Sequence, residues 1–276
     1  MISALPRLHA VTDDRVVLYG DIVPKAAAMA AALGETLAVH LRTRELPGQA
    51  MLALARALDD VLGPHGSWLI VNDRADIARA VPARAIVTGR SGLTAADVRR
   101  AAPGAIVGRS VHDAAEIRTV LEEAPDFLVA GSVFATPSHP DRTPAGLEVV
   151  SAAAAGGLPV IAIGGLTAGR TTEVIAAGAW GVAAIRALWD APDPAAAAGA
   201  FLSALPRDES VSVVVNGEAR RARRGLTLEG LLADLALDPR SVVVEHNRRI
   251  VRKDALGVTS LGEGDTIELV HFVGGG

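Results

Sequence analysis

The sequence contains no cysteine and few aromatic residues. Without cysteine there can be no disulfide, no thiol nucleophile and no thiolate ligand for a metal, which fits a reducing compartment. Aromatic residues make up 3% of the 276 residues, whereas 50% are hydrophobic. We therefore expect a core of alanine, valine, leucine and isoleucine side chains, in one large domain or two unequal ones.

The sequence also lacks a strong charge of either sign and lacks long apolar runs. Its formal net charge is −4, which gives no reason to expect nucleic acid or an anionic membrane as a partner. No apolar run approaches the roughly 18 residues of a membrane-spanning helix, and no charged-then-apolar signal opens the chain. We expect a soluble, cytoplasmic protein.

Short apolar runs alternate with alanine-rich amphipathic stretches from Leu8 to about Leu205. Eight such alternations, with strands that are apolar on both faces, predict a (β/α)₈ TIM barrel over residues 1–205. The main alternative, a doubly wound open sheet, usually has a glycine-rich fingerprint after its first strand, and this chain does not. The predicted strands are 8–13, 37–42, 67–73, 84–89, 105–111, 126–133, 159–165 and 181–188, and the predicted helices include 23–33, 48–62, 94–102, 113–123 and 171–179.

A polar connector, residues 206–210, precedes a different pattern over residues 211–276. Residues 211–215 alternate like a strand and Asn216-Gly217 is a strong hairpin signal. Thr227 is a suitable N-cap for a helix over 228–237, and further strands are predicted at 241–244 and 266–272. This order predicts a small α+β domain that resembles the ubiquitin-like (β-grasp) fold.

The sequence ends in three glycines, Gly274, Gly275 and Gly276. Ordered glycine loses much backbone entropy and offers no side chain to pack. A thin tail without Cβ atoms can instead thread a channel and present its terminal carboxylate to another active site. The alternative is a frayed chain end.

Basic and polar residues follow several predicted strands, and active sites of this fold lie at the C-terminal ends of the strands. His40 and Arg42 share one face of the second strand, with Arg44 close behind. Basic groups there suit an anionic substrate, and histidine can transfer protons near neutral pH. Further polar residues after the third, fifth and sixth strands are Asn72, Arg109, His112, Ser132 and His139. We expect Asn72 and Arg109 to bind the substrate, and we interpret His112 as a hydrogen-bonding residue of the rim.

Two glycines, Gly164 and Gly165, follow the seventh strand, and Arg186 follows the eighth. Glycine lets the backbone approach a ligand closely, and the N–H groups after it can bind an anion. These residues predict a phosphate cup, with a plain glycine turn as the alternative.

Six motifs together resemble the thiamine phosphate synthase and TenI family of barrels over residues 8–205. They are LHAVTDD (8–14), VHLRTR (39–44), VNDRAD (71–76), VGRSVH (107–112), GSVFATP (131–137) and PVIAIGG (159–165). The resemblance implies a thiazole phosphate as substrate and one of two activities.

The synthases of this family join a pyrimidine pyrophosphate to a thiazole phosphate and need Mg²⁺. The metal is held by an aspartate of the third-strand motif and by a second acidic residue after the fourth strand. Asp73 or its neighbour matches the first, but TGRSG (88–92) supplies no carboxylate. His40-Leu41-Arg42-Thr43-Arg44 also replaces the Gln-Leu-Arg-x-Lys of the synthases. These departures favour the TenI branch, a thiazole tautomerase that moves a proton to aromatise a carboxythiazole phosphate without a metal or cofactor.

The resemblance to TenI assigns the phosphate to Gly164, Gly165 and Arg186, and the carboxylate to Arg42 or Arg44. Its general base is less clear, because a characterised TenI has histidine where this chain has Ser132. A serine is a poor base unless it is activated, so His139 in the same loop or His40 across the barrel mouth are the candidates. A Mg²⁺-dependent synthase and a non-catalytic binding scaffold are the alternative functions of the barrel.

Residues 211–276 resemble the sulfur carrier ThiS. The matching motifs are VNG (215–217), TLEGLL (227–232), VVEHNRRIV (243–251), LGEGDTIELV (261–270) and the terminal Gly275-Gly276. The resemblance implies that an ATP-using activating enzyme adenylates Gly276, which then becomes a thiocarboxylate and donates sulfur to thiazole synthase. Both domains would then serve the thiazole part of thiamine biosynthesis in one fusion protein, and a homo-oligomer is left open.

Overall fold

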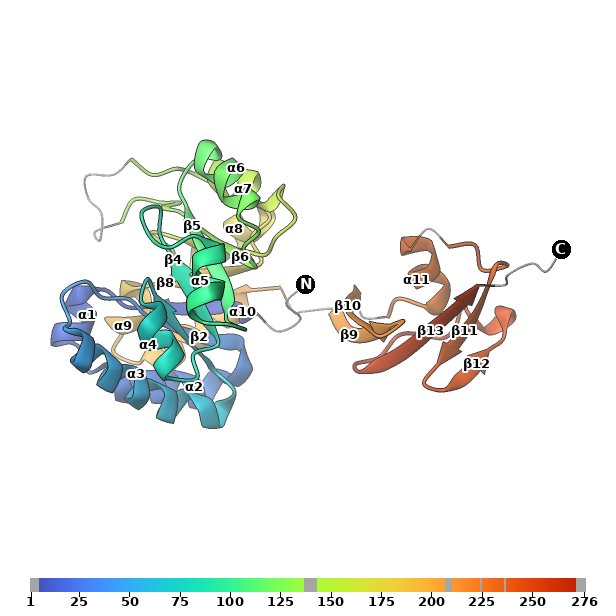
Figure 1. Ribbon diagram of the computed structural model, residues 1–276, viewed down its shortest axis with the longest axis horizontal. Helices are drawn as coiled ribbons and strands as arrows, with labels where there is room; N and C mark the ends of the chain where they lie inside the picture. The colour runs from blue at the N-terminus through green and yellow to red at the C-terminus, as the bar shows by residue number, and fades with distance from the viewer. Residues whose placement is uncertain (1–4, 137–142, 207–209, 224, 236, 272–276) are drawn as a thin grey trace. The chain divides into compact units, whose positions relative to one another are not determined.

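A computed structural model describes residues 5–136, 143–206, 210–223, 225–235 and 237–271. These residues form two compact units that divide near Pro206 (Figure 1). Among the helices of these ranges, none combines the length and the apolar character that crossing a membrane requires.

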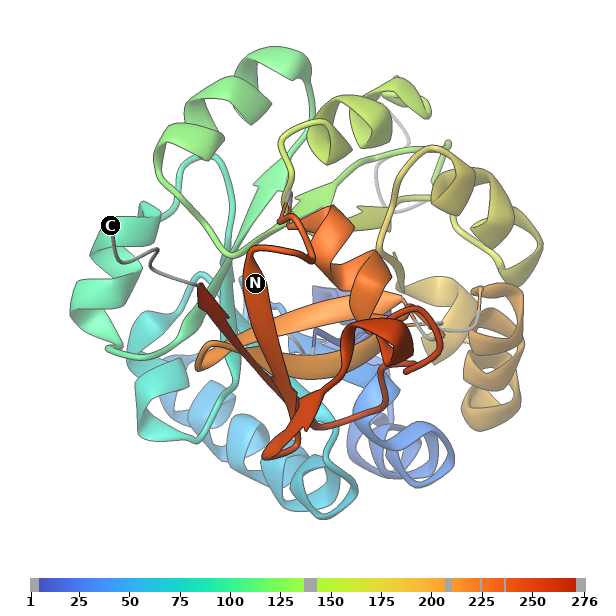
Figure 2. The same cartoon turned by 90° about the vertical axis from the view of Figure 1, so that its right-hand side faces the viewer.

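The first unit is a closed barrel of eight parallel strands in sequence order, ringed by helices (Figure 2), which confirms the predicted TIM barrel. The strands are β1 (Leu8–Val11), β2 (Leu37–Leu41), β3 (Trp68–Asn72), β4 (Ala85–Thr88), β5 (Ile106–Val111), β6 (Phe127–Ala130), β7 (Val160–Ile163) and β8 (Gly181–Ala184). The helices are α1 (Asp14–Tyr19), α2 (Ile22–Leu33), α3 (Gly48–Leu62), α4 (Ala75–Ala80), α5 (Ala95–Ala101), α6 (Ala114–Glu122), α7 (Glu148–Ala154), α8 (Thr171–Ala176), α9 (Arg186–Trp189) and α10 (Pro194–Ala204).

The barrel strands are buried on both faces because alternate residues serve two different layers. In β1, Leu8 and Ala10 belong to the apolar cluster between the strands and the helices. The residues between them, His9 and Val11, face the barrel interior by the alternation of a strand. The same parity places His40 of β2 inside, since His40 pairs with Val11.

A phenylalanine ring fills the barrel interior below the mouth. A Cβ atom on Gly108 of β5 would lie 2.4 Å from the Phe127 ring of β6, so only glycine leaves room for that ring. The Phe127 ring also lies beside His9, with 6.3 Å between the ring centroids. These residues fill the barrel interior directly below the mouth, where a site can lie.

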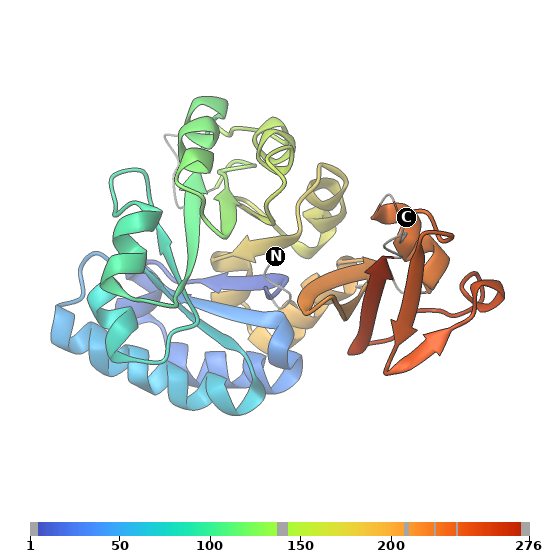
Figure 3. The same ribbon diagram turned by 45° about the vertical axis from the view of Figure 1, so that its right-hand side comes forward.

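The second unit is a five-stranded sheet of order β10-β9-β13-β11-β12 with one helix against it (Figure 3). Leu228, Leu231 and Leu232 of the helix are buried in its core, and Thr227 caps the helix by accepting a hydrogen bond from Gly230 N–H. This is the predicted ubiquitin-like fold. Its elements are β9 (Ser210–Val215), β10 (Glu218–Arg223), α11 (Leu228–Asp234), β11 (Val242–His246), β12 (Arg249–Val251) and β13 (Asp265–His271).

Candidate active site

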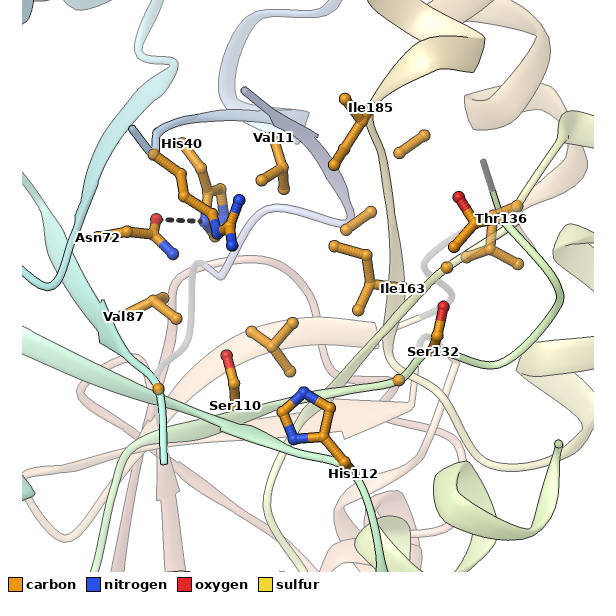
Figure 4. Close-up of a pocket in the computed structure, with 18 of the residues that line it drawn as sticks. Val11, His40, Asn72, Val87, Ser110, His112, Ser132, Thr136, Ile163 and Ile185 are labelled. Atoms are coloured by element: carbon orange, nitrogen blue, oxygen red, sulfur yellow. Dashed lines mark hydrogen bonds between the residues drawn. The ribbon is translucent and has the colours of Figure 1, made fainter. Parts of the chain in front are cut away.

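A cavity of about 1040 Å³ opens at the C-terminal ends of the barrel strands. It gathers predicted residues from five strand ends, and Figure 4 shows several of them converging from different sides of the mouth. The predicted residues that line it are His40, Arg42, Arg44, Asn72, Ser132, Gly164, Gly165 and Arg186.

The loop after β2, which carries Arg42 and Arg44, is held at two points. Thr12 Oγ1 accepts a hydrogen bond from the Arg42 N–H at 2.8 Å and donates to the Arg42 carbonyl at 2.9 Å. Asp14 Oδ1 accepts hydrogen bonds from the Thr43 hydroxyl and the Arg44 N–H, both at 2.6 Å, and from the Glu45 N–H at 3.2 Å. Burial acts to raise the pKa of Asp14, but these hydrogen bonds outweigh it and the pKa lies below its ordinary value. Asp14 therefore stays ionised and fixes the segment that presents arginine to the cavity.

The glycines after β7 form a tight turn against the β6 loop, and both line the cavity. A Cβ on Gly164 would lie 2.1 Å from Ser132 Oγ, so the close approach of this turn to the β6 loop requires glycine. The Gly164 carbonyl accepts a hydrogen bond from Phe134 N–H at 3.0 Å. Within the described ranges, the N–H groups of Gly165 and Leu166 have no backbone acceptor, and both residues line the cavity beside Arg186. These N–H groups can bind an anion.

A buried series of hydrogen bonds connects the barrel interior to Asn72. His9 Nε2 lies 2.9 Å from the Pro6 carbonyl, and His9 Nδ1 lies 2.7 Å from His40 Nε2. Burial lowers the pKa of His9 to about 4, an effect that the hydrogen bond to Pro6 only partly offsets. Burial, with the charge of His9 as the second cause, also holds the pKa of His40 well below its ordinary value. Both rings are therefore neutral near pH 7.

Because both rings are neutral, their partners determine which nitrogen of each ring carries the proton. A carbonyl only accepts, so His9 carries its proton on Nε2 and presents a lone pair at Nδ1. His40 must then donate from Nε2, which leaves a lone pair at its Nδ1, 3.2 Å from Asn72 Oδ1 (Figure 4). Two acceptors cannot bond, so we assign the reverse amide orientation, with the Asn72 nitrogen toward His40 and its oxygen toward the cavity.

Arg109, which we expected to contact substrate, does not line the cavity. Its side chain is 3% exposed and lies on the outer side of β5. Its Nη1 donates to Thr88 Oγ1 and to the carbonyls of Gly89 and Leu93, and its Nη2 pairs with Glu123. The correction follows from strand parity: Gly108 faces the interior, so its neighbour faces the helices. The Arg109 side chain therefore links the loop after β4 to the end of α6.

None of the three residues predicted as the general base is placed by the described structure to act as one. His139 lies outside the described residues. His40 is buried and both of its ring nitrogens are engaged. Ser132 lines the cavity, but its hydroxyl donates to the Phe134 carbonyl at 3.3 Å, and among the described residues no hydrogen bond joins it to a histidine or a carboxylate.

His112, which we interpreted as a hydrogen-bonding residue of the rim, is better placed to act as a base than the three predicted candidates. His112 follows β5, lines the cavity, and pairs with Glu116 through Nδ1 at 2.9 Å. The sequence signal for this pair is the spacing of four residues across the start of α6, which brings the two side chains together.

The charges around the cavity are unequal. Among the described lining residues, four arginines (Arg42, Arg44, Arg90 and Arg186) face one carboxylate, Asp73. Asp73 Oδ1 already accepts a hydrogen bond from Gly89 N–H at 3.1 Å. The described residues also contain no group of three or more histidine, cysteine, aspartate or glutamate residues able to hold a metal. Because Mg²⁺ prefers carboxylate and phosphate oxygens, this donor set suits an anionic ligand and fits a resident Mg²⁺ poorly.

The fold and the cavity define an α/β barrel with an arginine-lined site. A family model described as thiamine monophosphate synthase matches residues 8–188, and a ThiS family model matches residues 213–276. The chain therefore belongs to the thiamine monophosphate synthase family, with a ThiS-family domain after the barrel, as the two resemblances predicted.

Known relatives resemble mainly the barrel. The thiamine biosynthesis bifunctional protein ThiM/ThiE of Symbiobacterium thermophilum is 42% identical over 172 residues, 61% of this chain and 36% of the relative. The thiamine-phosphate synthase of Gloeobacter violaceus is 38% identical over 206 residues, 74% of this chain and 59% of the relative. The chain thus spans less than two thirds of these two proteins. The solved thiamine phosphate pyrophosphorylase of Pyrococcus furiosus is 28% identical, with a TM-score of 0.63 over 72% of this chain and 94% of that one.

Proposed function

We propose that the barrel is a metal-independent thiazole tautomerase, which aromatises a carboxythiazole phosphate for thiamine biosynthesis. The observation that carries this proposal is the set of charges at the cavity. Of the four lining arginines, Arg90 pairs with Glu116, and the other three stand against one carboxylate, Asp73, among the described lining residues. A substrate with a phosphate at one end and a carboxylate at the other complements that set. A Mg²⁺-dependent coupling would have one lining carboxylate, Asp73, as the protein ligand of the metal, with the substrate pyrophosphate supplying the other anionic oxygens.

The two anionic ends of the substrate would bind at different strand ends. The phosphate would lie against the N–H groups of the Gly164-Gly165 turn and near Arg186, because backbone N–H groups and a guanidinium together favour a doubly charged oxyanion. The carboxylate would meet Arg42 or Arg44, on the loop that Asp14 holds. Asn72, with its amide oxygen free for the cavity, would accept a hydrogen bond from the ligand between these two ends.

The test uses the full chain and the non-aromatic carboxythiazole phosphate, with aromatisation followed by proton NMR. We expect a rate above that of buffer, unchanged by EDTA and unchanged by added Mg²⁺, since no metal takes part. A rate that EDTA abolishes would contradict the metal-independent proposal. A rate equal to that of buffer would exclude the tautomerase and leave the synthase and the non-catalytic scaffold as candidate functions of the barrel.

The second candidate function is a thiamine phosphate synthase, and the names of the relatives favour it. The same preparation, given a pyrimidine pyrophosphate, a thiazole phosphate and Mg²⁺, tests it directly. Formation of thiamine phosphate above the rate of a barrel with Asp73→Asn would support this candidate, because Asp73 is the carboxylate among the described lining residues.

For the C-terminal domain, we propose a sulfur carrier whose Gly276 carboxylate becomes a thiocarboxylate. The match of the ThiS family model through residue 276 supports this proposal. The partners would be an adenylating enzyme that uses ATP and a thiazole synthase that receives the sulfur. Gly275 and Gly276 lie outside the described residues.

A further inference from the structure

The strongest unassigned feature of the molecule is the pair formed by His112 and Glu116. His112 comes directly after β5, and Glu116 lies in the first turn of α6. Glu116 Oε2 accepts hydrogen bonds from the His112 backbone N–H at 2.7 Å and from His112 Nδ1 at 2.9 Å. The Glu116 side chain is 7% exposed and that of His112 is 39% exposed. The carboxylate is therefore buried, and the imidazole that it holds reaches the cavity.

Glu116 is itself fixed from two further directions. Its Oε1 pairs with Arg90 Nε at 2.6 Å, which brings a positive charge to the buried carboxylate. The start of α6 is capped by Asp113, whose Oδ1 accepts hydrogen bonds from the N–H groups of Ala115 and Glu116. Since every partner of the carboxylate is a donor, Glu116 accepts through both oxygens and has no proton to give.

This arrangement settles which nitrogen of His112 can act. A carboxylate acceptor at Nδ1 requires the proton to be on Nδ1, so the lone pair of a neutral His112 is on Nε2. Within the described residues, Nε2 has no hydrogen-bond partner. Figure 4 shows the ring directed into the cavity, beside Ser110 and across from Asn72. A base held in one orientation by a buried carboxylate, with its other nitrogen open to a binding site, is the arrangement that proton abstraction uses.

We propose that His112 is the general acid–base residue of the tautomerisation and that Glu116 is its positioning residue. This inference rests on the proposed function. His112 Nε2 would take the proton from the tetrahedral carbon of the non-aromatic ring, and the electron pair of that C–H bond would enter the ring system. The imidazolium would return the proton to the carbon at the far end of the displaced double bonds. Atoms and charge balance in this isomerisation, and it needs no oxidant, reductant or metal.

Two variants of His112 separate catalysis from structure. In His112→Asn, the amide nitrogen can still donate to Glu116 as Nδ1 does, but the side chain has no basic nitrogen. We expect H112N and H112A both to lower kcat of the full chain for aromatisation by about 10²- to 10⁴-fold. Binding of the aromatic thiazole phosphate product should stay within about twofold of the wild type, and free imidazole should restore part of the H112A rate. His65→Ala, at an exposed histidine of the same domain, is the matched control and should leave kcat unchanged.

The opposite results are equally clear. If H112N keeps the wild-type kcat, the histidine serves only to hold Glu116 and the inference is overturned. It is also overturned if His139→Ala abolishes turnover while H112N does not. A wild-type chain that fails to accelerate aromatisation removes the proposed function itself, and this outcome differs from an active wild type with an active H112N. Glu116→Gln should lower kcat less than H112N, because the amide oxygen can still accept from Nδ1.

Discussion

At the scale of single residues, the barrel interior contains two histidine side chains that are buried in their neutral form. His9 and His40 occupy interior positions that a barrel usually fills with apolar side chains, and both are fully enclosed. Their hydrogen bonds to each other, to Pro6 and to Asn72 satisfy the ring nitrogens without any charge. This burial links the stability of the barrel to protonation.

The prediction at this scale concerns pH. An unfolded His9 titrates near 6.5 and the folded one near 4, so between these values the unfolded chain binds a proton that the folded chain excludes. The free energy of unfolding of the barrel should therefore fall as the pH falls through this window, by about 3 kcal/mol from His9 alone. Urea unfolding at pH 7, 6, 5 and 4, followed by tryptophan fluorescence, measures this loss, since all three tryptophans lie in the barrel.

The variant for this test is His9→Gln, which cannot take up a proton. It should be less stable than the wild type at pH 7 but should lose less stability between pH 7 and pH 5. His65→Ala, at an exposed position, should follow the wild-type curve. Equal losses in the wild type and in His9→Gln would mean that other groups carry the pH dependence.

Single positions also show where sequence reasoning is sufficient. His40 and Arg42 were expected on one inward face, and they line the cavity together, because β2 has one polar parity and one apolar parity. In β5 the two parities cannot be told apart from the sequence, since each contains one polar side chain, Arg109 in one and Ser110 in the other. The Phe127 ring, which needs the space at Gly108, decides the parity. That contact between different strands is invisible in a linear pattern, and so Arg109 was misplaced.

At the scale of elements, the loop between β2 and α3 depends on α1. Asp14, the first residue of α1, accepts three hydrogen bonds from this loop. The position of Arg44 therefore depends on the connection after β1 as well as on its own loop after β2. We expect Asp14→Ala to raise KM for the thiazole substrate by about tenfold with little change in kcat, because hydrogen bonds to a charged group contribute about 1.5–3 kcal/mol. Steady-state kinetics of aromatisation measure both constants.

The control for this prediction is Asp60→Ala, which removes an exposed carboxylate from α3. It should change neither constant. A fall in kcat at unchanged KM in Asp14→Ala would contradict the assignment, because it would connect the loop to the chemical step and not to binding.

Helices and strands could be predicted from the sequence where their hydrophobic pattern extended over enough residues. All eight barrel strands were expected, as continuous apolar runs, and α3 was expected over the residues that form it. The eighth strand was predicted too long, over 181–188, because β8 ends at Ala184 and Arg186–Trp189 form α9. The helices α1 and α4 have six residues each, too few to display a helical period. In the small domain, β12 has three residues and no apolar alternation, and it exists because it pairs with β11. Such elements are defined by their neighbours in space and not by their own sequence.

At the scale of the whole molecule, one chain joins a barrel of the thiamine monophosphate synthase family to a ThiS-family domain, which we propose supplies the sulfur of the thiazole. A covalent link raises the effective concentration of each domain's partners near the other. In the carrier, β13 lies in the middle of the sheet, parallel to β9 and antiparallel to β11. The chain leaves this central strand toward the terminal glycines, so the element that precedes the tail is paired on both of its edges.

The prediction at this scale is a change in mass. Incubation of the full chain with an adenylating enzyme of this pathway, ATP and a sulfur donor should exchange one oxygen for one sulfur at the terminal carboxylate. Intact-mass spectrometry and fragmentation of the C-terminal peptide would locate the exchange at Gly276. A chain without Gly275 and Gly276 should gain no sulfur under the same conditions. Sulfur found at another residue, or none in the full chain, would contradict a carrier role.

The series from Pro6 to Asn72 has one more consequence. Its ring protons are sealed from water, so they should exchange slowly and give resolved low-field signals in a proton NMR spectrum, apart from all amide resonances. A ligand that bonds to the Asn72 oxygen would polarise the amide and shift the His40 signal more than the His9 signal. The barrel thus contains its own internal probe, which reports on occupancy at its mouth without any label.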